Sequence, residues 1–161
     1  MSAAPAAGAA TSKSGEYDVF INHRGPDVKK TFVAHLYAAM SSWGIRPFLD
    51  AEDIRYAVPV FEEIDKALKG VCVHVAIFSK GYAESKYCLE ELCAMLKSEQ
   101  RIIPVFYDVE AENLRRPEDG PYKEAFEKHR KRKRTEKIPI WKEALHKVAD
   151  YRAFRMDEVN G

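Results

Sequence analysis

The order of apolar and amphipathic segments in this 161-residue chain predicts a doubly wound, flavodoxin-like α/β domain, with a parallel sheet of about five strands and helices on both faces. Two observations lead to this fold class. Short β-rich runs alternate with single segments of helical periodicity, which is the pattern of βαβ units with right-handed crossovers. The length suits one ordinary domain, and 46% hydrophobic residues with 32% charged ones exclude a chain that is disordered throughout.

The strands are predicted from the apolar runs. We expect strands at residues 17–21, 45–49, 71–78 and 102–107, with a short candidate strand at 151–156. The run at 71–78 is almost continuously apolar, which is typical of a central strand covered on both faces.

The helices are predicted from apolar residues spaced three and four apart, and we expect them at residues 27–43, 59–69, 85–98, 122–133 and 140–148. The first has Asp27 near its N-cap and Gly44 just past its end. Its apolar stripe consists of Phe32, Leu36, Met40 and Trp43. In the helix at 85–98, the residues that face the sheet are Leu89, Leu92, Cys93 and Leu96.

Composition divides the chain into a tail and one domain. Residues 1–15 hold almost only small residues, so we expect a disordered tail, with a plastid transit peptide as the less favoured alternative. The domain is expected at residues 16–158, followed by a short C-terminal end at 159–161. No apolar run is long enough for a transmembrane helix and no secretory signal is present, so we expect a cytoplasmic protein without a membrane partner.

The cysteines and the charge balance exclude two further classes. Cys72, Cys88 and Cys93 form no CxxC pair, so we expect reduced core or near-core thiols and no metal site. The net charge of +1 does not predict nucleic-acid binding. Residues 130–134 are an unbroken basic run that could bind phosphates or direct nuclear import, although a solvated helix face or loop is the favoured interpretation.

The fold class locates a candidate site before any motif does. In such a sheet, ligands bind beyond the carboxyl ends of strands one and three. The turn after the first strand holds residues 22–26, and the turn after the third, residues 79–82, leads into the helix that carries Ser85, Tyr87 and Glu91. Tyr87 and Glu91 are four residues apart and point away from the apolar stripe, so a solvated face is the simplest interpretation and the position at the switch point favours a functional one.

The familiar ligands of this fold do not suit these turns. A phospho-receiver needs acidic residues where Asn22, His23 and Arg24 stand. A flavin phosphate loop needs small residues where Arg24 and Pro26 stand. No GxGxxG or GxxxxGK[ST] motif is present, so dinucleotide binding of the Rossmann type and P-loop hydrolysis have no support.

The same residues resemble a known family. The segment YDVFI at 17–21 with His23-Arg24-Gly25, and above all the segment at 79–92 with Cys88-Leu89-Glu90-Glu91-Leu92, look like a plant Toll/interleukin-1 receptor (TIR) domain. The resemblance covers residues 16–158, and the chain is similar to the TIR-only proteins of grasses. Tyr87 stands where the family usually has tryptophan.

The resemblance implies hydrolysis or cyclisation of NAD⁺ at the nicotinamide–ribose bond, with NAD⁺ as substrate and no cofactor. Glu91 is the implied catalytic carboxylate, and the implied substrate-binding residues are Arg24, Ser85, Tyr87 and Arg55. Arg55 is the nearest substitute for an arginine of the loop after the second strand. One carboxylate suffices because nicotinamide is already a cationic leaving group, whereas ordinary glycosidases need two. Glu90 occupies a variable motif position and serves as the control.

The resemblance also implies partners and products. His35 matches the family's self-association helix, so a homo-oligomer is expected. The products would be ADP-ribose or cyclic isomers of ADP-ribose, sensed by lipase-like complexes in plant innate immune and cell-death signalling, in the cytoplasm and also in the nucleus. The rival interpretation is a non-catalytic adaptor that signals by homotypic TIR–TIR binding.

Overall fold

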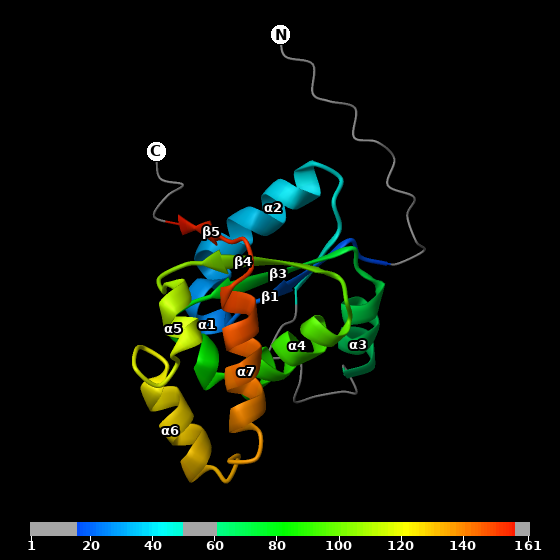
Figure 1. Cartoon of the computed structure of the whole chain (residues 1–161). Coiled ribbons are helices and arrows are strands. Elements are labelled where there is room, and N and C mark those ends of the chain that lie inside the picture. Colours follow the sequence, from blue (N-terminus) through cyan, green and yellow to red (C-terminus); the bar gives the residue numbers. More distant parts are fainter. Residues whose placement is uncertain (1–15, 50–60, 157–161) are drawn as a thin grey trace.

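The computed structural model describes residues 16–49 and 61–156. It contains one five-stranded sheet in the order β2-β1-β3-β4-β5, and all of its strand pairs are parallel (Figure 1). The strands are β1 Val19–Asn22, β2 Pro47–Leu49, β3 Val73–Phe78, β4 Arg101–Phe106 and β5 Phe154–Arg155. The predicted doubly wound α/β fold class is therefore confirmed.

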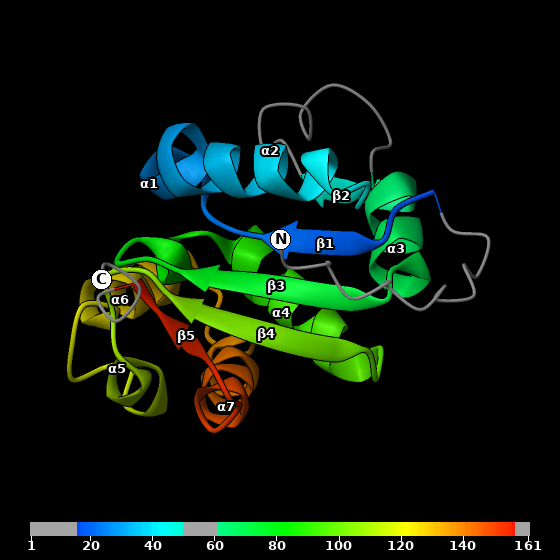
Figure 2. The same cartoon turned by 90° about the horizontal axis from the view of Figure 1, so that it is seen from above.

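Helices cover both faces of the sheet (Figure 2). One face is covered by α1 Gly25–Val28, a π-helical turn Lys29–Val33 and α2 Ala34–Ser42. The helices on the other face are α3 Phe61–Gly70, α4 Lys86–Lys97, α5 Ala111–Arg115, α6 Lys123–Lys131 and α7 Ile138–Ala149. A 3₁₀ turn, Tyr82–Glu84, precedes α4. Within the described residues, no helix is long and apolar enough to cross a membrane.

The sheet separates two apolar layers of unequal size. On β3, Val75 and Ile77 point into the smaller layer beneath α1 and α2, and Ala76 and Phe78 point into the larger layer beneath the other helices. This alternation follows the two-residue period of a strand. β3 is buried on both faces, as its apolar run predicts.

Two expectations are wrong, namely that Trp43 belongs to the buried stripe and that Cys72 lies in or near the core. Trp43 is 78% exposed rather than part of the buried stripe, because α2 ends at Ser42 and Trp43 is its C-cap residue. The π-helical turn also rotates the chain ahead of α2, so that Val33 is fully buried beside the half-buried Phe32. Cys72 is exposed because it precedes β3 at the amino edge of the sheet, whereas Cys88 is buried and Cys93 is half-buried.

One helix was not predicted. α5 has only five residues, and its N-cap is Glu110, a residue type that is not among the usual caps. Glu110 and Asn113 form a reciprocal capping box that holds this short helix. The predicted tail at residues 1–15 and the end at 159–161 lie outside the described residues.

Candidate functional site

The carboxyl edge of the sheet brings the two predicted turns together. β1 and β3 are adjacent, with Asn22 beside Ala76, so the turn after Asn22 lies next to the turn that begins at Ser79. Ser85 then starts α4 as its N-cap, and its Oγ accepts a hydrogen bond from the Cys88 amide at 3.3 Å. A contact between Ser85 and a substrate stays a prediction.

Glu91 is buried, with only 7% of its surface exposed, so the interpretation of a solvated face is wrong for this residue. Its burial is compensated by Asn22, whose Nδ2 donates a hydrogen bond to Glu91 Oε2 at 2.9 Å. Asn22 is itself fully buried, and the Tyr82 hydroxyl donates to its Oδ1. A carboxylate tolerates burial only when such partners compensate for lost water.

Glu91 and Tyr87 border one open pocket of about 340 Å³ between α3 and α4. The other residues that line it are Ile64, Asp65, Leu68, Glu90 and Ala94. The structure therefore brings two of the predicted site residues together in a space that combines an aromatic ring, apolar side chains and carboxylates. The Lys86 ammonium lies 5.0 Å from the centroid of the Tyr87 ring, in cation–π geometry.

Arg24 belongs to an ion-pair network that involves both turns. Its guanidinium pairs with Asp27 and, at 3.1 Å, with Glu84. Glu84 also pairs with Lys128 of α6 at 3.6 Å. Arg24 thus joins the turn after β1 to the turn after β3, which the sequence did not predict; its proposed contact with a substrate stays a prediction.

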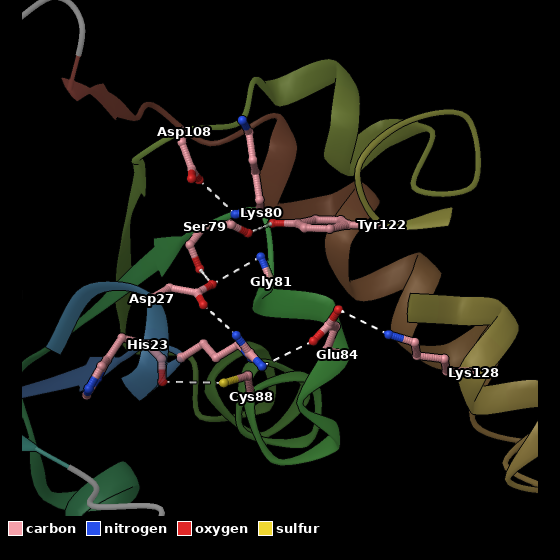
Figure 3. Close-up of polar contacts among 11 residues, drawn as sticks. His23, Asp27, Ser79, Lys80, Gly81, Glu84, Cys88, Asp108, Tyr122 and Lys128 are labelled. Atoms are coloured by element: carbon pink, nitrogen blue, oxygen red, sulfur yellow. Dashed lines mark hydrogen bonds and ion pairs between the residues drawn. The ribbon is translucent and has the colours of Figure 1, made fainter. Parts of the chain in front are cut away.

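Close packing supports this network. The Asp27 carboxylate accepts hydrogen bonds from Ser79 Oγ at 2.5 Å and from the Gly81 amide at 3.0 Å (Figure 3). A Cβ on Gly81 would come within 2.7 Å of both Asp27 Oδ2 and Arg24 Nη1, so a side chain here would displace these two groups. The Tyr122 hydroxyl donates to the Ser79 carbonyl at 2.8 Å and fixes the same turn from the side of α6.

The remaining predicted residues lie apart from the pocket. His35 is exposed on the first turn of α2, and Arg55 lies outside the described residues. In the basic run, Arg130 pairs with Glu118, and Arg134 donates to His129 Nδ1 at 3.1 Å. The side chains between them, at residues 131–133, are exposed.

Sequence reasoning missed three polar residues that organise this edge. Asn22 and Tyr82 form the hydrogen-bond chain to Glu91. His129 is buried, and its Nε2 donates to the Ala83 carbonyl at 2.7 Å, while burial lowers the pKa of its imidazole. The available signal for Asn22 was its position, because a polar residue that directly ends an inner parallel strand needs a buried partner.

Comparisons with known proteins agree on one family. The family model described as TIR domain matches residues 16–160. The TMV resistance protein N of Nicotiana glutinosa is 33% identical over 150 residues, which cover 89% of this chain and 13% of that protein. The "Probable 2' cyclic ADP-D-ribose synthase BdTIR" of Brachypodium distachyon is 43% identical over 102 residues, covering 63% of this chain and 46% of that protein.

A solved structure gives the same result at the level of the fold. The TIR domains of the activated Roq1 resistosome, which recognises the effector XopQ, match with a TM-score of 0.78 and 37% identity, covering 89% of this chain and 90% of that one. This chain spans less than half the length of the two curated relatives named above. The predicted resemblance is confirmed, and the chain belongs to the TIR-domain family.

Proposed function

We propose that this chain cleaves NAD⁺ at the nicotinamide–ribose bond, with Glu91 as the catalytic carboxylate. The observation that carries the proposal is the burial of Glu91 in a fixed orientation, together with Tyr87, at one pocket between α3 and α4. The name of the Brachypodium relative, a 2' cyclic ADP-D-ribose synthase, supports the same class of reaction.

The chemistry needs little more than an oriented carboxylate. The bond between the ribose C1′ and the nicotinamide nitrogen breaks, and its electron pair leaves with nicotinamide, which departs neutral. Positive charge then develops on the ribose, and a carboxylate held nearby stabilises that charge in the transition state more than in the ground state. Attack by water, which loses a proton, gives ADP-ribose, whereas attack by a hydroxyl of the same molecule gives a cyclic isomer.

The other site residues take supporting roles in this proposal. Tyr87 stacks on a flat ring of the substrate, and Ser85 bonds near the scissile ribose. Arg24 already pairs with Asp27 and Glu84, so a contact with the diphosphate requires it to exchange one of these partners. Arg55 is proposed to contribute from the loop after β2.

Self-association belongs to the same proposal. The Roq1 match is to TIR domains within an activated resistosome, and His35 is exposed on α2, where a second copy can reach it. We place the chain in plant immune and cell-death signalling, in the cytoplasm and nucleus, with products that are read by lipase-like complexes. Nucleic-acid binding by the basic run is a weaker proposal, because Arg130 and Arg134 already have partners in the chain.

The test is release of nicotinamide from NAD⁺ by concentrated protein, followed by chromatography with mass spectrometry. Glu91→Gln keeps the side-chain shape and removes the charge, so we expect a loss of at least about 100-fold. Glu90→Gln is the matched control, because Glu90 lies at the same pocket but is exposed, and it should keep most of the activity. Equal losses in two folded variants would contradict the role of Glu91, and the mass of the product distinguishes ADP-ribose from a cyclic isomer.

A non-catalytic adaptor is the second candidate, and one observation favours it. Tyr37, Trp43 and Ile45 are large apolar residues that are 41%, 78% and 38% exposed near the end of α2, as expected of a surface that binds protein. An adaptor would self-associate in light scattering and release no nicotinamide at the same concentration. Release that is abolished by Glu91→Gln excludes this candidate.

A further inference from the structure

We infer that Asn22 and Tyr82 are positioning residues that orient the Glu91 carboxylate for the proposed NAD⁺ cleavage. The inference rests on the proposed function, because it assigns to these residues a role that acts through Glu91. Neither residue lines the pocket, so neither is proposed to touch the substrate.

The geometry is a short chain of buried hydrogen bonds. Asn22 ends β1, Tyr82 begins the 3₁₀ turn after β3, and both side chains are fully buried. Asn22 Nδ2 donates to Glu91 Oε2 at 2.9 Å and to the Cys88 carbonyl at 3.4 Å. The Tyr82 hydroxyl donates to Asn22 Oδ1 and lies 3.1 Å from the Cys88 carbonyl.

The partners at both ends decide which way the amide points, because Glu91 and the Cys88 carbonyl accept from Nδ2 and the Tyr82 hydroxyl donates to Oδ1. An asparagine amide has one accepting and one donating end, and a flip would exchange them. Reversed, the amide would turn its oxygen toward the Glu91 carboxylate and toward a carbonyl, leaving buried acceptors opposite one another without a proton between them. Burial raises the pKa of Tyr82, so its hydroxyl keeps the proton that it donates to Asn22.

The Asn22 amide orients Glu91 without itself adding a charge. An amide is an uncharged donor, so it fixes one carboxylate oxygen and places no positive charge beside it. A lysine or arginine in the place of Asn22 would fix the oxygen equally well but would oppose a cationic substrate. Among the described residues, the titratable side chains near Glu91 include Tyr82, Cys88, Tyr87, Asp65 and Glu90.

The experiment compares two nearly isosteric variants with a matched control, at one enzyme concentration. Asn22→Asp replaces the donor by a second carboxylate that must share a proton with Glu91, so the acid limb of the kcat profile should move up by about one pH unit or more. Tyr82→Phe leaves Asn22 Oδ1 without its buried donor, so the amide holds Glu91 less firmly and kcat should fall on the order of 10- to 100-fold with little change in KM. Tyr122→Phe is the control, because Tyr122 is equally buried and its hydroxyl bonds to Ser79 instead.

The outcomes separate this inference from the proposed function. The proposed function stands if the parent is active and Glu91→Gln is inactive. In that case, the inference is overturned if Asn22→Asp keeps the parental pH profile. It is also overturned if Tyr82→Phe loses no more kcat than Tyr122→Phe. If the parent releases no nicotinamide, the proposed function fails. Carbon NMR titration of the Glu91 carboxyl then tests the positioning role without any measurement of activity. The carboxyl should titrate at higher pH in Asn22→Asp than in the parent, and an unchanged titration would overturn the inference.

Discussion

At the carboxyl edge of the sheet, Glu91, Asp27 and Arg24 are buried or half-buried among hydrogen-bond partners, whereas at the amino edge the ion pair between Asp18 and Arg46 leaves half of the Arg46 side chain exposed. The amino edge also carries the exposed Trp43, just ahead of β2. The one edge holds charged groups in fixed positions, and the other presents a surface that a partner can cover.

The two edges also differ in the hydrogen-bond partner that each provides for a buried ionisable group. Glu91 has an amide donor, whereas His74, the second residue of β3, is fully buried and its Nε2 lies 3.2 Å from the Ser98 hydroxyl. Burial lowers the pKa of His74 to about 4. The comparison indicates that the carboxyl edge is organised around charge and that the amino edge depends on an uncharged imidazole.

The largest expected effect is loss of stability in acid through His74. Its pKa is lower in the folded chain than the ordinary 6.5, so the folded state takes up a proton less readily than the unfolded state. The stability that the neutral His74 contributes is fully present above pH 6.5 and is lost as the pH falls toward about 4. This loss lowers the free energy of unfolding by about 3 kcal/mol. Denaturant titrations at several pH values measure this.

His74→Gln is the control for that titration, and it should remove most of the dependence of the free energy of unfolding on pH between about 4 and 6.5. His129 contributes in the same direction, because burial also lowers its pKa. A slope that is the same in the parent and in His74→Gln would contradict the assignment to His74.

A smaller effect is expected from the ion pairs of the two edges. Arg24→Ala leaves Glu84 and Asp27 without their shared cation in a half-buried place, so we expect a loss of about 2 kcal/mol in the free energy of unfolding. Arg46→Ala is the matched variant at the amino edge, where solvent screens the pair, and its thermal midpoint should stay close to that of the parent. Equal shifts of the two midpoints would show that the edges do not differ.

Tyr87 provides a third comparison, within the pocket. Tyr87→Ala removes the ring and leaves the substrate loosely held, so we expect kcat/KM for NAD⁺ to fall about tenfold. Tyr87→Trp should be tolerated or should raise the affinity, because indole offers a larger stacking surface. Activity of Tyr87→Ala equal to that of the parent would refute stacking at this position.

Self-association should change activity less strongly. If assembly completes the site, the specific activity rises with protein concentration, and His35→Ala should lower it about threefold at a fixed concentration. Dilution series of both proteins, followed by nicotinamide release, measure this effect. A specific activity that is constant over a wide dilution range would instead indicate a site that is complete in the monomer.

The smallest effect on folding is expected at Trp43. Because 78% of its surface is exposed, Trp43→Gln should change the free energy of unfolding by less than about 0.5 kcal/mol, while it weakens self-association in light scattering. A large loss of stability would mean that Trp43 packs within its own chain.

These differences also explain what the sequence could predict. The positions of the main strands, the central position of β3 and the burial of Leu89 and Leu92 follow from local apolar patterns, so they were predictable. The burial of Glu91 was not, because it depends on Asn22, which lies 69 residues away in the chain. Trp43 was misplaced because helical periodicity was extended to the C-cap residue, whose backbone has already left the helical conformation.

The position of Cys72 makes the chain suitable for attachment at a single site. It is the exposed one of the three thiols, whereas Cys88 is buried and burial raises the pKa of Cys93, which leaves less reactive thiolate. A maleimide dye or a surface tether should therefore react first at Cys72. Since Cys72 stands at the amino edge, where its amide bonds to the Asp18 carbonyl, a dye attached there should report on the approach of a second copy to that edge.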